Sequence, residues 1–455
     1  MKTAWTLMAA AMVGLATGCV AAQSGGQGDG PEVREVGFDE RYEPTPMPDR
    51  IVLTWTGDPK TTQAVTWRTS PEVATGIAEI AEATHGPEFT RSTERYTAAT
   101  ESYASDLSVA HYHTVNFEGL TPGTAYVYRV GDGVNWSEWF QFTTEPASDE
   151  PFSFVYFGDA QNDVRSMWSR ITREAFRDAP RAAFFLHAGD LINKPTKDGE
   201  WGEWFEAGSF INATIPVIAT PGNHEMARTK LDNGSYHYEL DGHYPIQFAF
   251  PENGPAGLLS TVWYVDYGDL RIVSLNSNER LDEQTDWLDR VLSENDRNWT
   301  AVTFHHPVFA MAKERDNKEL RELWKPILDK HRVDIVLNGH DHSYGRTGLV
   351  GALGGLADVL NVAEGRSAVS DAGTVYVVSV SGPKMYDGRS DHLVDVVSQA
   401  EDTQLYQVLT IDGDELRYVA RTALGQVYDA FTLRKTENGP NELVEGEIEV
   451  EARRR

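Results

Sequence analysis

Two different hydrophobic patterns divide the chain. From about residue 47 to 146, short apolar runs recur between turn residues, as where residues 125–130 lead into Gly-Asp-Gly at 131–133. No helical period of comparable strength occurs there, so this part is predicted to be an all-β sandwich. From about residue 150 to 435, strand-like apolar runs alternate with amphipathic segments. That alternation predicts a layered α/β domain with helices flanking its sheets.

The second part contains the more specific element predictions. Apolar runs predict strands at residues 152–157, 182–186, 215–219, 262–267, 271–275, 301–304, 333–337 and 375–380. Helical spacing predicts helices near residues 165–178, 282–295 and 317–331.

Both ends of the chain are predicted to lie outside these domains. Residues 20–46 are rich in Gly, Gln, Pro and charge and predict a flexible linker, while residues 436–455 are mostly charged and predict a solvated tail. The first 19 residues combine a positive start, a short apolar run and small residues before Cys19, which is typical of an export signal. Their ending resembles the lipobox of bacterial lipoproteins, which implies a lipid on Cys19 and a place in the cell envelope or periplasm. An ordinary secretory signal with an incidental cysteine is the alternative.

Composition limits the partners. An apolar fraction of 40% suits packed cores, and the single cysteine excludes an intramolecular disulfide. The formal net charge of -29 argues against nucleic acid as a partner, because few cations are available to replace condensed counterions. It does not exclude an anionic substrate, since bound metal ions would reverse the sign of the local field. No later segment has the length of a membrane span, so a lipid on Cys19 is the expected route to a membrane.

Five apolar runs of the second part end directly in metal-ligand residue types. These endings are Gly158-Asp159, Gly189-Asp190, Gly222-Asn223-His224-Glu225, His305-His306 and Gly339-His340-Asp341-His342. Because functional groups gather outside the carboxyl ends of strands in α/β sheets, the five endings are expected to converge on one cleft. Two carboxylates, one amide and three imidazoles suit zinc, manganese or iron, and one carboxylate can bridge a pair of ions. Taken singly, each ending could instead be a loop cap or a buried core pair.

The five endings together resemble the motifs of the calcineurin-like metallophosphoesterases. Residues 339–346 resemble the last motif of purple acid phosphatases, Gly-His-x-His-x-Tyr-x-Arg, and residues 429–433 resemble the closing strand of that family. Those enzymes also carry a fibronectin-like domain before the catalytic one. Here residues 119–128 resemble the hallmark loop and strand of fibronectin type III domains, with Tyr126 packed as a corner.

The resemblance implies a role for each matching residue. Asp190 would bridge two divalent metal ions, and His224 would lie beside the phosphate as general acid or transition-state stabiliser. The other implied ligands are Asp159 and His342 for the first ion, and Asn223, His305 and His340 for the second.

One ligand position departs from the family pattern. Purple acid phosphatases have Tyr three residues after the bridging Asp, where this chain has Asn193. Many other metallophosphoesterases have His two residues after the first Asp, where this chain has Gln161. Either amide could bind the first metal ion or hydrogen-bond to one of its ligands. The predicted consequence is a colourless protein whose first site holds a divalent ion less tightly.

These observations predict an exported hydrolase of phosphate monoesters, with diesters as a variant, in which a metal-bound hydroxide attacks phosphorus in line. The alternative is an exported binding or adhesion protein that uses its β-sandwich and keeps a structural metal domain. His237 and His243, within residues 226–261, could contact a small phosphorylated substrate or belong to a packed loop.

Overall fold

The computed structural model describes residues 34–351, 373–437 and 439–450. They divide into two compact units, one ending at Gly37 and one beginning at Phe38. The predicted export signal with Cys19 lies outside the described residues, as do the first part of the predicted linker and the final arginines.

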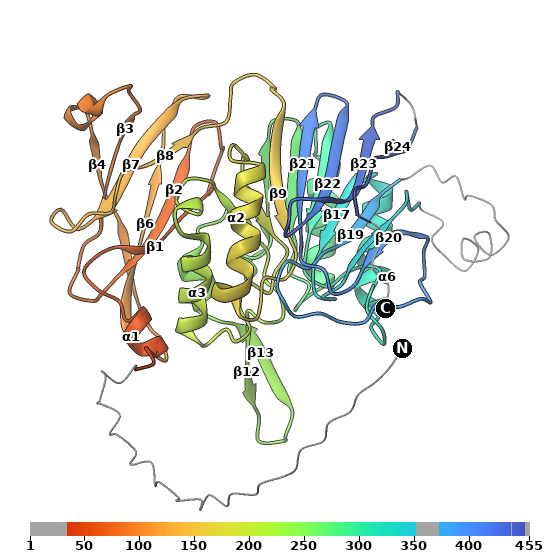
Figure 1. Ribbon diagram of the computed structural model, residues 1–455, viewed down its shortest axis with the longest axis horizontal. Coiled ribbons are helices and arrows are strands. Elements are labelled where there is room, and N and C mark those ends of the chain that lie inside the picture. The colour runs from red at the N-terminus through yellow and green to blue at the C-terminus, as the bar shows by residue number, and fades with distance from the viewer. Residues whose placement is uncertain (1–33, 352–372, 438, 451–455) are drawn as a thin grey trace, which may run out of the picture. The chain divides into compact units, whose positions relative to one another are not determined.

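The first domain is a sandwich of two four-stranded sheets, as its short alternating runs predict (Figure 1). One sheet has the order β1 (Asp49–Thr54), β2 (Gln63–Thr69), β6 (Val109–Phe117) and β5 (Ala99–Ala104). The other has the order β4 (Glu94–Thr97), β3 (Ile77–Glu82), β7 (Ala125–Gly131) and β8 (Phe140–Thr143), and the short helix η1 (Pro87–Arg91) precedes β4. Buried Val65 and Trp67 meet Phe117 and Tyr128 in the core between the sheets.

Tyr126 forms the predicted corner at the start of β7. Its hydroxyl accepts a hydrogen bond of 2.9 Å from the Thr121 backbone N–H, and the ring is buried. Gly123 has φ +65°, a left-handed conformation that costs most other residues free energy. The turn between Thr121 and Tyr126 therefore depends on this glycine.

The second domain contains two seven-stranded sheets that share one hydrophobic core, which confirms the predicted layered α/β class. The first sheet has the order β11 (Val217–Ala219), β10 (Phe185–His187), β9 (Phe152–Phe157), β21 (Leu405–Asp412), β22 (Glu415–Thr422), β23 (Val427–Arg434) and β24 (Glu442–Glu445). The second has the order β14 (Trp263–Tyr267), β15 (Leu270–Ser274), β16 (Trp299–Thr303), β17 (Ile335–Asn338), β19 (Val375–Val378), β18 (Tyr344–Thr347) and β20 (Val396–Ala400).

Helices pack on both sheets. On the first sheet lie α2 (Ser169–Asp178), which continues the turn η2 (Val164–Trp168), and α3 (Asp198–Gly208), which is followed by η3 (Ser209–Ile211). On the second lie α5 (Thr285–Ser293), preceded by η4 (Asp282–Gln284), and α6 (Lys318–Lys330). The periodic segments at 165–178, 282–295 and 317–331 are therefore helical, whereas α3 was not predicted from the sequence.

Part of the predicted linker and part of the predicted tail are folded. Helix α1 (Phe38–Tyr42) packs on α3, where Gly199 and Gly202 leave room for its rings, and the Tyr42 hydroxyl donates to Glu206 at 2.6 Å. In the predicted tail, β24 pairs with β23 at the edge of the first sheet. An edge strand with one exposed face needs few apolar residues, so the charged sequence of β24 did not predict a strand.

Residues 226–261 also contain regular structure. Strands β12 (Met226–Lys230) and β13 (Tyr236–Leu240) form a hairpin that projects from the domain (Figure 1), and α4 (His243–Gln247) follows. Across the described part of the chain, no helix combines the length and apolar character of a membrane span.

Candidate metal centre

The strand order brings the five predicted endings to one place. Strands β9, β10 and β11 run parallel in the first sheet, and β16 and β17 run parallel in the second. Parallel strands end at the same edge, so the residues that follow them become neighbours although they lie far apart in sequence. The residues delivered in this way are Asp159, Asp190, Asn223, His305, His340 and His342.

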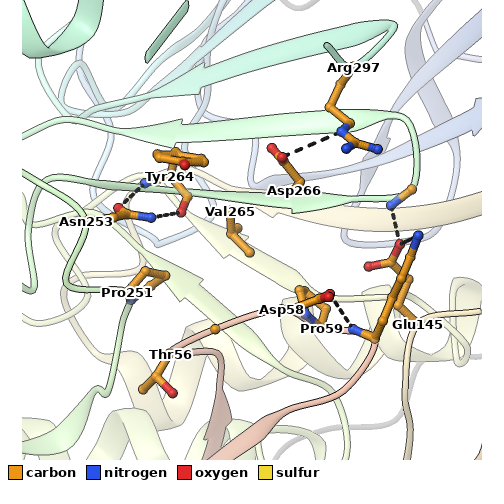
Figure 2. A pocket seen from close by; sticks show the side chains of 13 residues that line it. Thr56, Asp58, Pro59, Glu145, Pro251, Asn253, Tyr264, Val265, Asp266 and Arg297 are labelled. Carbon is orange, nitrogen blue, oxygen red and sulfur yellow. Dashed lines mark hydrogen bonds and ion pairs between the residues drawn. The ribbon is translucent and has the colours of Figure 1, made fainter. Parts of the chain in front are cut away.

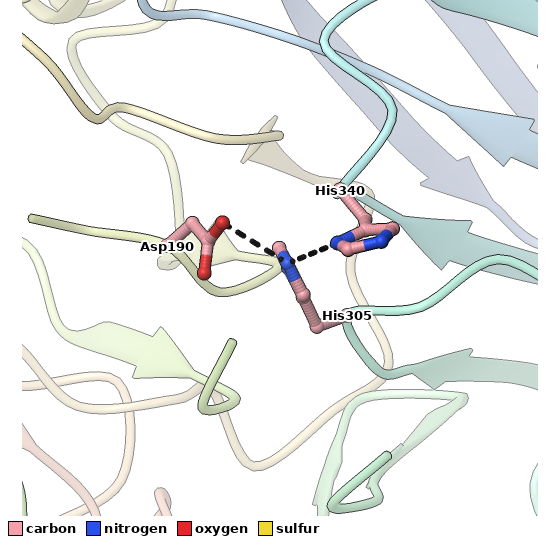
Figure 3. Close-up of side chains that lie close together, drawn as sticks. All are labelled: Asp190, His305 and His340. Atoms are coloured by element: carbon pink, nitrogen blue, oxygen red, sulfur yellow. Dashed lines mark hydrogen bonds and ion pairs between the residues drawn. The ribbon is translucent and has the colours of Figure 1, made fainter. Parts of the chain in front are cut away.

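These side chains form two groups that share Asp190. The first group is Asp159, Asp190 and His342, and the second group is Asp190, His305 and His340 (Figure 3). Within each group the potential ligand atoms lie within 4.8 Å of one another. Asn223 joins the second group, since its Oδ1 lies 3.2 Å from His305 Nε2.

Backbone carbonyls orient the imidazoles. His305 Nδ1 donates to the Ala188 carbonyl and His342 Nδ1 donates to the Lys384 carbonyl, each at 2.8 Å. A carbonyl only accepts, so Nδ1 carries a proton and Nε2 is the nitrogen that faces the site. His342 Nε2 then lies 3.1 Å from Asp159 Oδ2, and His305 Nε2 lies 3.2 Å from Asp190 Oδ2. A cation bound in either place would replace a proton on Nε2.

The buried carboxylates make the centre attract positive charge. Burial would lower the pKa of His305, but the charges of Asp190 and Asp159 outweigh it and raise that pKa to about 9. Burial likewise favours the neutral acid at Asp190, yet the surrounding imidazoles hold its pKa well below the usual range. Burial and the neighbouring rings of His306 and His305 hold the pKa of His340 far below that of a free imidazole.

The ligand turns are tightly packed and partly strained. Asp190, His340 and His342 have positive φ angles of 54°, 77° and 47°, which cost non-glycine residues about 1–2 kcal/mol each. A Cβ on Gly222 would lie 2.2 Å from Asp190 Oδ1, and one on Gly339 would lie 2.3 Å from Asp159 Oδ1. The motif glycines therefore leave the space that the carboxylates occupy.

Glu225 has a positioning role that the sequence reasoning did not assign. Its Oε2 accepts the backbone N–H groups of Asp190 and Gly222 at 2.8 and 2.6 Å, and its Oε1 accepts that of Leu191 at 2.8 Å. The side chain is fully buried, and burial together with the charge of Asp190 raises its pKa to about 8. The sequence signal for this role is that Glu225 directly follows Gly222-Asn223-His224 in one of the five strand endings.

Asp341 connects the last ligand turn to the loop before α6. Its Oδ2 accepts the backbone N–H groups of Met311 and Ala312, and its Oδ1 lies 3.3 Å from Arg315 Nη1. The same Arg315 nitrogen donates to the His340 carbonyl at 2.7 Å. A carboxylate placed between two candidate ligands in sequence thus supports the backbone that carries them.

Gln161 and Asn193 occupy different positions. The Gln161 amide is buried, with Nε2 at 2.6 Å from Asp190 Oδ2 and 3.1 Å from His342 Nε2, so it lies within the first group. Asn193 instead offers its backbone carbonyl to His224 Nδ1. The opposite ring nitrogen of His224, Nε2, lies 4.0 Å from Asp190 Oδ2 at the rim of the centre.

The two remaining candidate residues, His237 and His243, belong to neither group. His243 is buried between Asp241 and Asp198, with 1% of its side chain exposed, and is not placed to touch a substrate. His237 is exposed on β13, 4.0 Å from Glu239, and points to the opposite strand face from Tyr238.

A separate cavity of about 340 Å³ lies against the sandwich domain (Figure 2). Its lining includes Asp58 and Glu145 from the sandwich side and Tyr264, Asp266 and Arg297 from the second domain. The six candidate ligands do not line it, so it is not part of the candidate metal centre.

Comparison with known proteins agrees with this architecture. The family model of the purple acid phosphatase N-terminal domain matches residues 48–144, and that of the calcineurin-like phosphoesterases matches residues 152–344. The solved structure of purple acid phosphatase PPD1 from yellow lupin is similar in fold, with a TM-score of 0.69 and 19% identity over 86% of this chain and 75% of that one.

The relatives found by sequence match a smaller share of the chain. An uncharacterised protein of Mycobacterium tuberculosis is 28% identical over 333 residues, covering 63% of this chain and 61% of that protein. The protein named probable inactive purple acid phosphatase 1 of Arabidopsis thaliana is 25% identical over 274 residues, covering 52% of this chain and 44% of that protein. Each match spans less than two thirds of the relative's own length. Residues 152–344 therefore belong to the calcineurin-like phosphoesterase family, and residues 48–144 belong to the family of purple acid phosphatase N-terminal domains.

Proposed function

We propose that the chain hydrolyses phosphate monoesters, with diesters as a variant of the same reaction, at a centre of two divalent metal ions. The observation that supports this most is the sharing of Asp190 by two compact groups of ligand atoms. A carboxylate common to two ligand groups is the arrangement that bridges a pair of ions. The phosphoesterase family of the second domain supports the reaction class.

The residues present fit such a pair of ions. Asp159 and His342 would hold the first ion, Asn223, His305 and His340 would hold the second, and Asp190 would bridge them. Gln161 donates its amide N–H to Asp190 Oδ2 and so supports that ligand. Asp159 Oδ2 and Gln161 Oε1 are buried and have no hydrogen-bond partner in the described part of the chain, a defect that a cation would remove. The mixed oxygen and nitrogen set suits zinc, manganese or iron. Bound ions would lower the pKa of water and neutralise charge developing on the phosphate oxygens.

His224 is the group best placed to transfer a proton. Its Nδ1 donates to the Asn193 carbonyl, so Nε2 can donate only when the ring is the imidazolium. That proton would go to the leaving oxygen of the ester, or would bond a non-bridging oxygen as charge develops. The ring is a quarter exposed, which leaves it accessible to a substrate.

The test is hydrolysis of 4-nitrophenyl phosphate by the purified chain supplied with manganese or zinc. Asp190→Asn should lower kcat by at least about 10²–10³-fold, because the bridging charge is lost. Metal content measured on the same sample should fall as well. Activity that survives this substitution would rule out the two-metal assignment.

A matched control is Asp289→Asn, an exposed carboxylate on α5 that pairs with Lys330. This variant should keep the wild-type rate and metal content, since it lies outside the centre. Both proteins are checked by circular dichroism, so that loss of activity is not confused with loss of folding.

The competing function is a non-catalytic binding or adhesion protein. The observation in its favour is that a relative carries the word inactive in its name. A chain of that kind would fail to hydrolyse either a mono- or a diester when saturated with metal.

We also propose that the chain is exported and that Cys19 becomes lipid-modified. The support is the sequence of the first 19 residues alone. Expression of the full chain in a bacterial host should place it in the membrane fraction, and Cys19→Ser should release it. Equal partition of both proteins into the soluble fraction would contradict the lipid.

A further inference from the structure

The hairpin of β12 and β13 is a two-stranded sheet that pairs with none of the other sheets in the described part of the chain (Figure 1). Residues 228–239 are exposed along its whole length. A two-stranded hairpin without a third strand or a covering helix is at best marginally stable in water. Among the described residues, the hairpin therefore lacks the packing that normally stabilises a sheet.

The two ends of the hairpin fix how its strands are paired. At the tip, Gly234 has φ +86° and donates its backbone N–H to the Leu231 carbonyl, while the Leu231 N–H donates to the Ser235 carbonyl at 2.9 Å. This is a three-residue loop with a left-handed glycine, a common connection in hairpins. At the base, the Asp241 N–H donates to the Glu225 carbonyl at 3.0 Å. Both ends are thus hydrogen-bonded pairs of the same register.

This pairing leaves one edge of β13 open. Along an antiparallel pair, hydrogen-bonded and non-hydrogen-bonded residue pairs alternate. Because the pairs at Ser235 and Asp241 are hydrogen-bonded, every second residue between them bonds to β12. The residues that instead direct their backbone N–H and C=O groups to the outer edge are Tyr236, Tyr238 and Leu240. In the described residues β13 pairs with β12 alone, so another strand can join this edge.

Charge distinguishes the two edges of the hairpin. The outer edge of β12 carries Arg228 and Lys230, so two copies of that edge paired about its middle would oppose like charges. The three outward residues of β13 are uncharged. Two basic residues, Arg228 and Lys230, and two acidic ones, Asp232 and Glu239, balance within the hairpin, whereas the chain has a formal net charge of -29. Two copies can therefore approach here with little electrostatic repulsion.

We infer that the free edge of β13 is a dimer interface, on which a second copy of this chain pairs its own β13 antiparallel about a two-fold axis at Tyr238. Tyr238 and the partner's Tyr238 then exchange their outward backbone hydrogen bonds. Tyr236 lies opposite the partner's Leu240 on the same face of the sheet. Two separate hairpins thereby become one four-stranded sheet.

The side chains are complementary in this register. Tyr236 and Tyr238 are 45% and 54% exposed, and aromatic and apolar cross-strand pairs would remove part of that surface from water. On the other face, His237 lies opposite the partner's Glu239, so a ring that can donate a proton faces a carboxylate. Strand pairing requires no metal ion, so the interface does not depend on the proposed function.

The test is sedimentation of the full chain carrying Cys19→Ser, which excludes association through a lipid or a native disulfide. A reversible dimer is expected as the concentration rises from about 1 to 100 μM, since a small interface gives weak association. Tyr238→Pro removes the central outward N–H and should raise the dimer dissociation constant at least about tenfold. The matched control is Arg228→Pro, which removes the outward N–H of the residue opposite Tyr238 on β12 and should leave that constant unchanged.

Disulfide cross-linking tests the register and decides the case if a proline disturbs the hairpin itself. His237→Cys and Glu239→Cys are introduced separately into the Cys19→Ser chain. Oxidation of the mixture should give a disulfide-linked dimer, because the two positions face each other across the axis in a non-hydrogen-bonded pair. Each variant alone should give much less.

Three results would overturn the inference. One is a chain that stays monomeric over the whole concentration range. Another is a dimer that Arg228→Pro weakens as much as Tyr238→Pro does. The last is cross-linking that is no greater in the mixture than in either variant alone.

Discussion

At the scale of single residues, the candidate ligands are held by the backbone of the protein. Carbonyls orient His305 and His342, and Glu225 accepts three backbone N–H groups of the turns around Asp190. Removing one ligand side chain therefore leaves the turns that carry the others supported. Substitutions at the centre are expected to change metal binding more than folding.

Gln161→Ala should weaken the first metal site by about 10–100-fold, the usual effect of losing a group that binds or supports a ligand. The amide lies 2.6 Å from Asp190 Oδ2 and 3.1 Å from His342 Nε2, so its loss touches that site directly. Metal content at a fixed free concentration gives the measurement, with exposed Gln141→Ala as control. Unchanged occupancy of two ions would contradict a role for Gln161.

The iron-loaded protein should be colourless, because Asn193 replaces the tyrosine whose charge transfer colours purple acid phosphatases. Its visible absorption spectrum after iron loading in air checks this. A strong band would contradict the prediction. Loss of that band in Tyr386→Phe would then assign it to Tyr386, whose ring centroid lies 4.6 Å from that of His342.

At the scale of elements, the last motif is connected to the closing strand. Arg346 on β18 pairs with Asp429 on β23 through two contacts of 2.7 and 3.0 Å, and the Tyr344 hydroxyl donates to the same carboxylate at 2.5 Å. The two strands belong to different sheets, so this buried cluster joins the two sheets. It also explains why the motif extends beyond its histidines.

Asp429→Asn should lower the free energy of unfolding by about 3 kcal/mol, because it removes the charge of the buried partner of Arg346. The other carboxylate paired with Arg346 in the described residues, Glu445, is half exposed. Urea unfolding at neutral pH gives the measurement. Exposed Asp412→Asn, at the end of β21, should change stability by less than about 0.5 kcal/mol. Equal effects of both substitutions would show that the cluster does not stabilise the fold.

At the scale of the whole molecule, a buried charged network joins the sandwich to the second domain. Arg50 and Arg68 of the sandwich reach Asp198 of α3 at 2.7 and 2.9 Å. His243 lies between Asp198 at 3.3 Å and Asp241 at 2.6 Å. Since these groups are almost fully buried, separating the domains would leave buried charges without their partners.

The contribution of His243 should depend on pH. Burial alone would lower its pKa, but hydrogen bonds to Asp198 and Asp241 raise it above the ordinary value. The stabilisation is therefore complete below about pH 6.5, the usual pKa of an unfolded histidine, and is lost as pH rises through the folded pKa. At pH 6 the urea midpoint of the wild type should exceed that of His243→Gln, and at pH 9 this difference should be smaller. A difference between the two proteins that stays constant would refute this.

Local sequence was sufficient for much of the fold and for the six candidate ligands. A strand buried on both faces favours a continuous apolar run, so the segment 152–157 coincides with β9. The ligand residue types at the strand ends predicted which side chains would form the candidate centre. Contacts between distant residues decided the rest. Helix α3 contains three glycines, which weaken its local helical signal, and packing on α1 stabilises it, while pairing with β23 stabilises the charged strand β24. The burial of His243 likewise depends on segments that meet only in the folded chain.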